Sequence, residues 1–411
     1  MRFVFNPPAE AAAGLLTLPW EQPLQEWTDD RLVEVRQRGL SRHVVRFVAE
    51  GGEVFAVKEI DERLARREHH LLRRLEQLGI PAVEVLGVVA DRPHGMQAVL
   101  VTRFLDYSTP YRNLFANPRG GQLTDRLLDA LVELLVRLHL ACFVWGDCSL
   151  SNTLFRHDAG AFAAYLVDAE TAEIHPSLSD GMRNYDVSLA FERVGGELFD
   201  LQGAGLLHED VDPVAVAEQI PLRYEGLWGE LTREDVLQPG EQRYRIAERL
   251  QRLNELGFDV DELELVEGPD GNRLRVHTRI AEPGHHRALL MTRTGLDAEE
   301  NQARRLLNDI ASFRGWLEQT EGRKVAEAAA ANRWLVEVYD PIVGAIPPDL
   351  RGRLDDAEVF HEILEHRWFL SEAAGQDVGT TAAAKDYFAS VLPAVPPDLT
   401  AGTGMRGIIG P

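Results

Sequence analysis

Two short polar motifs separated by an apolar stretch constrain this 411-residue chain more than any other feature. The first is Gly146-Asp147, with Asn152 five positions after the acid, and the second places Asp168 behind a short apolar run. Carboxylate and amide oxygens are hard ligands for divalent cations, and a further carboxylate can orient a hydroxyl for attack on a phosphoryl group. We therefore expect Asp147 to be the catalytic carboxylate that orients the hydroxyl, with Asn152 and Asp168 as metal ligands.

The alternative for the first motif is a loop that Asp147 and Asn152 merely close, because both residue types often cap turns. An upstream lysine favours the catalytic interpretation. Lys58 follows the apolar residues 55–57 at the end of an expected strand. This pattern is typical of a lysine that binds the α- and β-phosphates of a nucleotide.

A helix is expected at residues 62–78, because leucines recur on one of its faces. The helix offers Glu68 as the carboxylate that holds Lys58 in place. Glu59 and Glu62 are the competing candidates. We expect Lys58 and Glu68 to form an ion pair within a catalytic site.

The nucleotide-binding positions carry weaker signals. In the turn between the first two expected strands, Gly39 and Ser41 occupy the place of a loop that covers phosphates, although a plain hairpin suits its single glycine better. Arg103 and Leu105 lie in the expected link between two lobes, where an adenine can bond to main-chain groups. This second assignment rests on the order of the elements alone.

Seventeen residues separate Asp168 from Asp186. An acid at position 186 can accept backbone N–H groups of the loop around Asp147 and hold that loop rigid, while a helix N-cap is an equally good alternative. Eukaryotic-type protein kinases have a long activation segment at this place, which ends in Ala-Pro-Glu and helps to bind extended peptides. Here the interval is short and the tripeptide is absent, so little chain remains for a peptide-binding platform. A small hydroxylated acceptor, or a hydroxyl on a dedicated partner protein, is therefore favoured.

The composition narrows the range of partners. The chain has 66 acidic and 43 basic residues, a formal charge of -23. Such a surface repels nucleic acid and anionic lipids, so we expect neither as the main partner. No stretch approaches the roughly 20 apolar residues that span a bilayer, and two cysteines supply no disulfide framework. We expect a cytoplasmic protein without a membrane span.

The length and the periodic patterns predict an α+β protein with several parts. Residues 1–28 are expected to be irregular. A domain at residues 29–238 should combine a small antiparallel sheet lobe, ending near residue 105, with a helical lobe. Residues 239–392 predict a mostly helical domain with one β-hairpin, which we interpret as positioning a partner or substrate. The tail, residues 393–411, is rich in Pro and Gly and is expected to be loose.

Six residues stand in the order typical of the kinase-like superfamily: Lys58, Glu68, Asp147, Asn152, Asp168 and Asp186. Within it, the Gly-Asp-x4-Asn motif and the Val-Asp-Ala-Glu sequence at the second acid look most like the bacterial lipopolysaccharide core (Kdo and heptose) kinases. The whole chain also resembles bacterial proteins in which such a domain precedes a C-terminal domain of unknown function. The resemblance implies a bilobal protein-kinase-like fold and a phosphotransferase that uses ATP and Mg²⁺ to phosphorylate a hydroxyl of a small molecule, sugar or protein.

Two positions depart from the pattern of that group. Trp145 stands where the group usually has His, which removes a side chain that would stabilise the loop, so another group must do so. Ala169 replaces an aromatic or glycine-adjacent position. These departures leave a pseudokinase open, a regulatory scaffold that binds nucleotide and acts through its C-terminal domain. An active kinase is favoured because the lysine, both metal ligands and the catalytic acid are all present.

Overall fold

The computed structural model describes residues 1–34, 43–115, 120–232, 236–237, 260–267, 274–280 and 284–395. They form two compact units. Unit 1 contains Met1–Arg156 and Ala163–Glu230, and unit 2 contains His157–Phe162 and the described chain after Leu231. The sequence suggested a boundary after residue 238, whereas the contacts divide the chain after Glu230 and assign the short segment 157–162 to the second unit.

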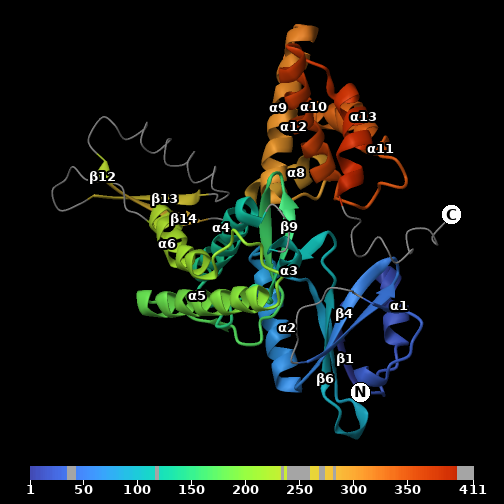
Figure 1. Ribbon diagram of the computed structural model, residues 1–411, viewed down its shortest axis with the longest axis vertical. Coiled ribbons are helices and arrows are strands. Elements are labelled where there is room, and N and C mark those ends of the chain that lie inside the picture. Colours follow the sequence, from blue (N-terminus) through green and yellow to red (C-terminus); the bar gives the residue numbers. More distant parts are fainter. Residues whose placement is uncertain are drawn as a thin grey trace. The chain divides into compact units, whose positions relative to one another are not determined.

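A six-stranded antiparallel sheet forms the small lobe of unit 1 (Figure 1). Its order is β1 (Arg2–Phe5), β5 (Val85–Ala90), β6 (Ala98–Arg103), β4 (Glu53–Ile60), β3 (Val44–Glu50) and β2 (Leu32–Val33). Every residue of β5 is buried, because this strand has a neighbour on each side. Helix α2 (Glu62–Gln77) packs on β5 and β6, and Asp61 caps it by accepting the N–H of Arg63.

The N-terminal residues belong to this lobe. Strand β1 pairs with β5, and helix α1 (Ala9–Leu16) contacts β3. Trp20 and Trp27 are buried and pack edge to face with ring centroids 5.2 Å apart. The expectation of an irregular segment at residues 1–28 is therefore wrong. A strand of four residues is recognisable only through its partner, which lies more than 80 positions away in the sequence.

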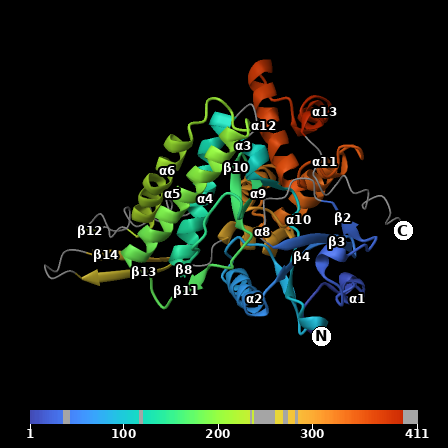
Figure 2. The same cartoon turned by 60° about the horizontal axis from the view of Figure 1, so that its bottom comes forward.

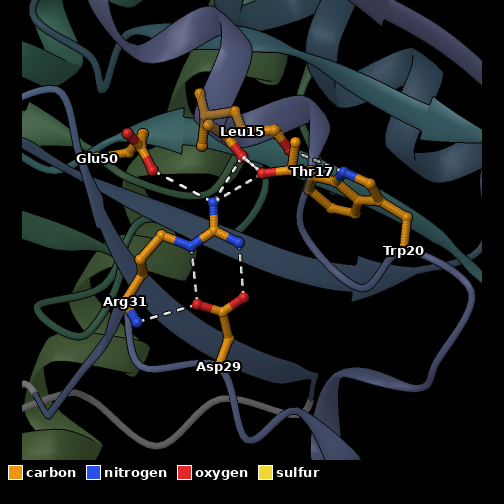
Figure 3. A network of polar contacts seen from close by, with 7 residues as sticks. Leu15, Thr17, Trp20, Asp29, Arg31 and Glu50 are labelled. Carbon is orange, nitrogen blue, oxygen red and sulfur yellow. Dashed lines mark hydrogen bonds and ion pairs between the residues drawn. The ribbon is translucent and has the colours of Figure 1, made fainter.

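Arg31 ties the N-terminal segment to the sheet (Figure 3). Its guanidinium makes a bidentate pair with Asp29, donates to the carbonyl of Gly14 at 2.7 Å and lies 3.3 Å from Glu50 in β3. The hydrogen bonds from Arg31 lower the pKa of Asp29 to about 2. The network holds the end of α1 against strand β3 of the small lobe.

The large lobe of unit 1 is mainly helical. Figure 2 shows α4 (Gly120–Leu140), α5 (Asp180–Gly203) and α6 (Pro213–Thr232) side by side. His139 of α4 is buried between them, with Nε2 3.0 Å from Asp186 and Nδ1 2.6 Å from the hydroxyl of Tyr224. The shorter elements are α3 (Tyr111–Phe115), β7 (Ser108–Pro110), β8 (Phe143–Val144), β9 (Thr153–Asp158), β10 (Ala161–Leu166) and β11 (Glu173–Ile174). The sheet lobe and this helical lobe confirm the predicted bilobal kinase-like architecture.

Unit 2 is mostly helical, as predicted. It contains α8 (His285–Thr294), α9 (Glu300–Glu321), α10 (Glu327–Trp334), α11 (Asp340–Gly344), α12 (Asp356–Ala374) and α13 (Thr380–Ser390). Trp334, Tyr339, Phe360 and Tyr387 lie in its core. The predicted hairpin is present as β13 (Val260–Glu267) and β14 (Leu274–Ile280), with β12 (Val236–Leu237) on the other edge of β14.

Some predictions fall outside the described residues. These are the turn positions Gly39 and Ser41 and the tail from residue 396 onward. Within the described part of the chain, no helix is both long enough and apolar enough to cross a bilayer.

Buried acids fix the segment 157–162 within unit 2. Asp158, 2% exposed, accepts the backbone N–H groups of Asn301 and Gln302 at 3.1 and 2.8 Å, at the start of α9. Glu358 of α12, 1% exposed, accepts the N–H of Ala159 at 2.8 Å and the amide of Gln302 at 2.7 Å. Burial raises the pKa of Asp158 to about 7 and that of Glu358 to about 8.

Candidate active site

The side-chain ammonium of Lys58 in unit 1 contacts two other predicted site residues, Glu68 and Asp168. Lys58, on β4, lies with Nζ 2.9 Å from Glu68 Oε2 and 3.0 Å from Asp168 Oδ2. Glu68 comes from the buried face of α2 and is 1% exposed. Glu59, one of the competing carboxylates, instead pairs with Arg92, and Glu62 pairs with Arg66. Among the three carboxylates considered, Glu68 is the one that contacts Lys58.

Burial and charge act against each other at this ammonium group. Burial disfavours the charged lysine, but the carboxylates of Glu68 and Asp168 outweigh it and raise the pKa of Lys58. Burial and the charge of Asp168 raise the pKa of Glu68 to about 7, although Lys58 lowers it. The charged form of Lys58 is therefore held in place before any ligand arrives.

Residues 145–152 form the loop of the first motif, which we call the catalytic loop after its predicted role. It brings the side chains of Asp147 and Asn152 together. Asn152 donates from Nδ2 to the main-chain carbonyl of Asp147 and to Asp147 Oδ2, both at 3.1 Å. Asn152 therefore contacts Asp147 through its side-chain nitrogen, and its side-chain oxygen takes no part in these two hydrogen bonds. The carbonyl of Asn152 accepts the N–H of Val167 at 3.0 Å. The backbone beside Asp168 is thereby joined to the catalytic loop.

Trp145 itself makes a stabilising hydrogen bond, although the sequence predicted that it could not replace the usual His. Its indole Nε1 donates to the main-chain carbonyl of Asp168 at 3.1 Å, and the side chain is fully buried. We expected that another group would have to stabilise the loop in place of the usual His. That expectation is wrong in part, because the indole N–H itself bonds the loop of the second motif.

Asp186 supports the catalytic loop from inside α5. Its carboxylate, 0% exposed, accepts the N–H of Trp145 at 2.7 Å and that of Gly146 at 2.8 Å. Gly146 has a φ of 74°, which favours glycine at this point of the loop. The N-cap of α5 is Ser179, so the alternative role of Asp186 as a helix cap is wrong. A buried acid that binds two main-chain donors keeps the loop in one conformation.

Sequence reasoning missed two residues of α5 that face the same loop. Glu197 accepts the N–H groups of Leu150 and Ser151 at 2.7 and 3.1 Å. Arg193 lies with Nε 3.3 Å from Asp147 Oδ1. Both lie on the helix face of Asp186, at seven and eleven positions after it, and that helical spacing was the available signal.

Another missed pair joins the start of β3 to the second motif. His43 Nε2 lies 2.8 Å from Glu170 Oε2, and both side chains are mostly buried. Glu170 is the last residue of the Val-Asp-Ala-Glu sequence. The sequence alone gave no signal for a partner that lies 127 positions away.

The remaining nucleotide-binding predictions concern Gly39, Ser41, Arg103 and Leu105. Gly39 and Ser41 lie outside the described residues. Arg103 ends β6, where its N–H donates to the carbonyl of Glu84 and its side chain lies 3.3 Å from Glu53. The carbonyl of Leu105 accepts the hydroxyl of Ser108 at 2.7 Å. A role of Arg103 and Leu105 in nucleotide binding stays a prediction.

The arrangement combines the groups that phosphoryl transfer requires. The ammonium of Lys58 lies beside the carboxylate of Asp168. The carboxylate of Asp147 lies in the loop that Asp186 holds, and it accepts the side-chain amide of Asn152. An Asn and an Asp side chain form a donor set that suits Mg²⁺, which nucleotide enzymes bind through one or two side chains together with phosphates and waters.

Two family models match different parts of the chain. Residues 53–186 match the model of the Lipopolysaccharide kinase (Kdo/WaaP) family. Residues 226–392 match a family described as Domain of unknown function (DUF4032). No curated protein matches the chain. One solved structure, described as WaaP in complex with acyl carrier protein, is 18% identical with a TM-score of 0.35, covering 62% of this chain and 99% of that chain. The chain is thus similar to the lipopolysaccharide kinase (Kdo/WaaP) family over residues 53–186 and to the DUF4032 family over residues 226–392.

Proposed function

We propose that this protein transfers a phosphoryl group from ATP to a hydroxyl of a small-molecule, sugar or dedicated protein acceptor, with Mg²⁺ as cofactor. The observation that carries the proposal is the position of Lys58 between Glu68 and Asp168. A buried lysine held by two carboxylates is poised to bind phosphate oxygens, and one of those carboxylates is then available to a cation.

Each residue has a role that follows from its contacts. Lys58 binds the α- and β-phosphates, and Glu68 keeps its ammonium in place. Asn152 and Asp168 offer oxygens to Mg²⁺, which neutralises the charge that develops on the transferred group. Asp147 orients the acceptor hydroxyl and accepts its proton as the phosphoryl group passes to that oxygen and ADP is released. Asp186, Glu197 and Trp145 hold the loop in which these groups lie.

The proposed acceptor is a small molecule or a hydroxyl on a dedicated partner. The short interval between Asp168 and Asp186 favours a small acceptor or a dedicated partner over general peptides. The C-terminal domain is the candidate for positioning that acceptor. Efficient phosphorylation of unrelated peptides would argue against this part of the proposal.

Nucleotide binding is the direct test. The melting temperature of the full-length protein should rise with ATP, and should rise further with ATP and Mg²⁺, because ligands that bind the folded state stabilise it. Release of ADP should then be measured with Mg²⁺ present. Nucleotide binding without any turnover would favour the pseudokinase alternative, and the absence of binding under both conditions would remove the proposed site.

A further inference from the structure

A cation lies beside the proposed catalytic acid. Arg193, in the middle of α5, places Nε 3.3 Å from Asp147 Oδ1. Its side chain is 59% exposed, whereas that of Asp147 is 20% exposed. Among the residues that the structure describes, Arg193 is the one cation within ion-pair distance of Asp147, and it has no second ion-paired partner.

The two oxygens of Asp147 have different neighbours. Oδ2 accepts the amide of Asn152, a proposed metal ligand, and Oδ1 faces Arg193. An acceptor hydroxyl activated by Asp147 must come within hydrogen-bond reach of one of these oxygens. Oδ1 is the oxygen that Asn152 does not occupy. An acceptor bound there would have its neighbouring substituents next to the guanidinium of Arg193.

A structural role explains Arg193 poorly. Asp186 and Glu197, seven positions before it and four after it, use their carboxylates to bind N–H groups of the loop. Arg193 makes no such bond to the loop backbone among the described contacts. A half-exposed ion pair contributes only about 0–1 kcal/mol to stability, so holding Asp147 gives little reason for an arginine here.

The chemistry of the guanidinium identifies the ligand. Its planar fork of N–H donors matches the oxygens of a carboxylate or a phosphate. Two carboxylates lie near Arg193: Asp147 is its ion-pair partner, and Glu197 lies one helical turn along α5 and close enough to Asp147 for the two charges to repel. Without a cation, this place would repel an anionic acceptor.

We propose that Arg193 determines acceptor specificity by binding an anionic group, a carboxylate or a phosphate, that lies next to the reacting hydroxyl. The inference rests on the proposed phosphotransferase function. Binding of the anion draws the guanidinium from Asp147 Oδ1, which leaves this oxygen open to accept the hydroxyl proton. An uncharged acceptor lacks the group that releases Oδ1 and binds more weakly.

The test compares three sugars that differ only at C6: D-galactose, D-galacturonate and D-galactose 6-phosphate. A sugar is chosen because sugar hydroxyls are among the proposed acceptors. Isothermal titration calorimetry with the full-length protein, without nucleotide, should show one or both anionic sugars binding at least about tenfold more tightly than galactose. Tighter binding of D-galacturonate would identify a carboxylate as the recognised group, and tighter binding of D-galactose 6-phosphate would identify a phosphate.

Three variants test whether the preference for anionic sugars depends on Arg193. Arg193→Ala should lose the preference, and Arg193→Lys should keep part of it, because lysine retains the charge without the fork. Arg74→Ala is the matched control, since it removes the same charge from an exposed position on α2 and should keep the full preference. Equal binding of all three sugars to the wild-type protein, no binding of any, or a preference that survives in Arg193→Ala would overturn the proposal.

The outcomes separate this inference from the proposed function. A protein that prefers anionic sugars through Arg193 but binds no Mg-ATP would contradict the kinase proposal alone. A protein that turns over ATP without an Arg193-dependent preference would contradict the inference alone.

Discussion

The indole N–H of Trp145 bonds the main-chain carbonyl of Asp168 at 3.1 Å, so a buried tryptophan links the catalytic loop to the proposed metal-binding loop. The same tryptophan gives its backbone N–H to Asp186. One residue thereby joins α5 and both motifs. The sequence predicted that Trp145 would remove a stabilising side chain, but the tryptophan itself connects the two loops.

Replacing this tryptophan should therefore affect metal binding as well as stability. In Trp145→Phe the buried carbonyl of Asp168 loses its donor, which should cost about 1–3 kcal/mol of unfolding free energy and weaken Mg-dependent ATP binding. Both are measured by thermal denaturation with and without Mg-ATP. Trp334→Phe is the control, because Trp334 is also buried and donates to Asp309 at 2.6 Å in unit 2. The prediction fails if both variants lose the same Mg-ATP affinity.

Removing the proposed proton acceptor should stop transfer but not nucleotide binding. Asp147→Asn keeps the shape of the side chain and should lower turnover by roughly 10²- to 10⁴-fold, the usual contribution of a proton-handling group. Steady-state ADP release and ATP affinity are the two measurements. Unchanged turnover in the folded variant would remove Asp147 from the mechanism.

Metal and phosphate contacts should separate in two further variants. Asp168→Ala should lose the Mg-dependent part of ATP binding, because it removes a charged oxygen ligand. Lys58→Met should weaken ATP binding with or without Mg²⁺. Lys58→Met also leaves Glu68 buried without its cation, so it is best made together with Glu68→Gln to preserve folding. Normal Mg-ATP binding by both proteins would contradict the assignment of the site.

Unit 2 should lose stability as the pH rises through neutrality. The pKa of Glu358 is 4.5 in an ordinary setting and about 8 in the folded protein, so its contribution is complete below about pH 4.5 and is lost by pH 8. Glu358→Gln does not titrate there and can still accept the N–H of Ala159. Urea titrations between pH 5 and 8 should show that the unfolding free energy of this variant falls less steeply with pH than that of the wild-type protein. The two slopes should differ by up to about 1.4 kcal/mol per pH unit. Glu372→Gln, exposed on the same helix, should follow the wild-type slope.

The N-terminal strand can be tested through a glycine of its partner strand. A Cβ at Gly87 would lie 2.1 Å from the carbonyl oxygen of Val4, so Gly87→Ala must push β1 away from β5. We expect a loss of about 1–3 kcal/mol in unfolding free energy. Gly229→Ala, in α6 with open space around it, should instead stabilise the protein by about 0.5–1 kcal/mol. Equal effects would show that β1 is not held as described.

The candidate site residues and their order along the chain could be predicted from the sequence, because each is recognisable from the residues next to it. Lys58 ends an apolar strand, Asp147 and Asn152 keep a fixed spacing, and Asp168 follows a second apolar run. The hairpin and the long helices of the C-terminal domain were predictable for the same reason, since period and turn residues are local properties.

Only the tertiary structure decided which groups meet. Arg193 reaches Asp147 because packing turns one face of α5 toward the catalytic loop, and Asp158 finds its donors in a helix 143 positions later. Such contacts depend on the side chains of two elements at once, and the burial that selects them is a property of the folded chain. The choice of Glu68 over Glu59 and Glu62 was likewise made by burial, because a charge in the interior must lie where an opposite charge can meet it.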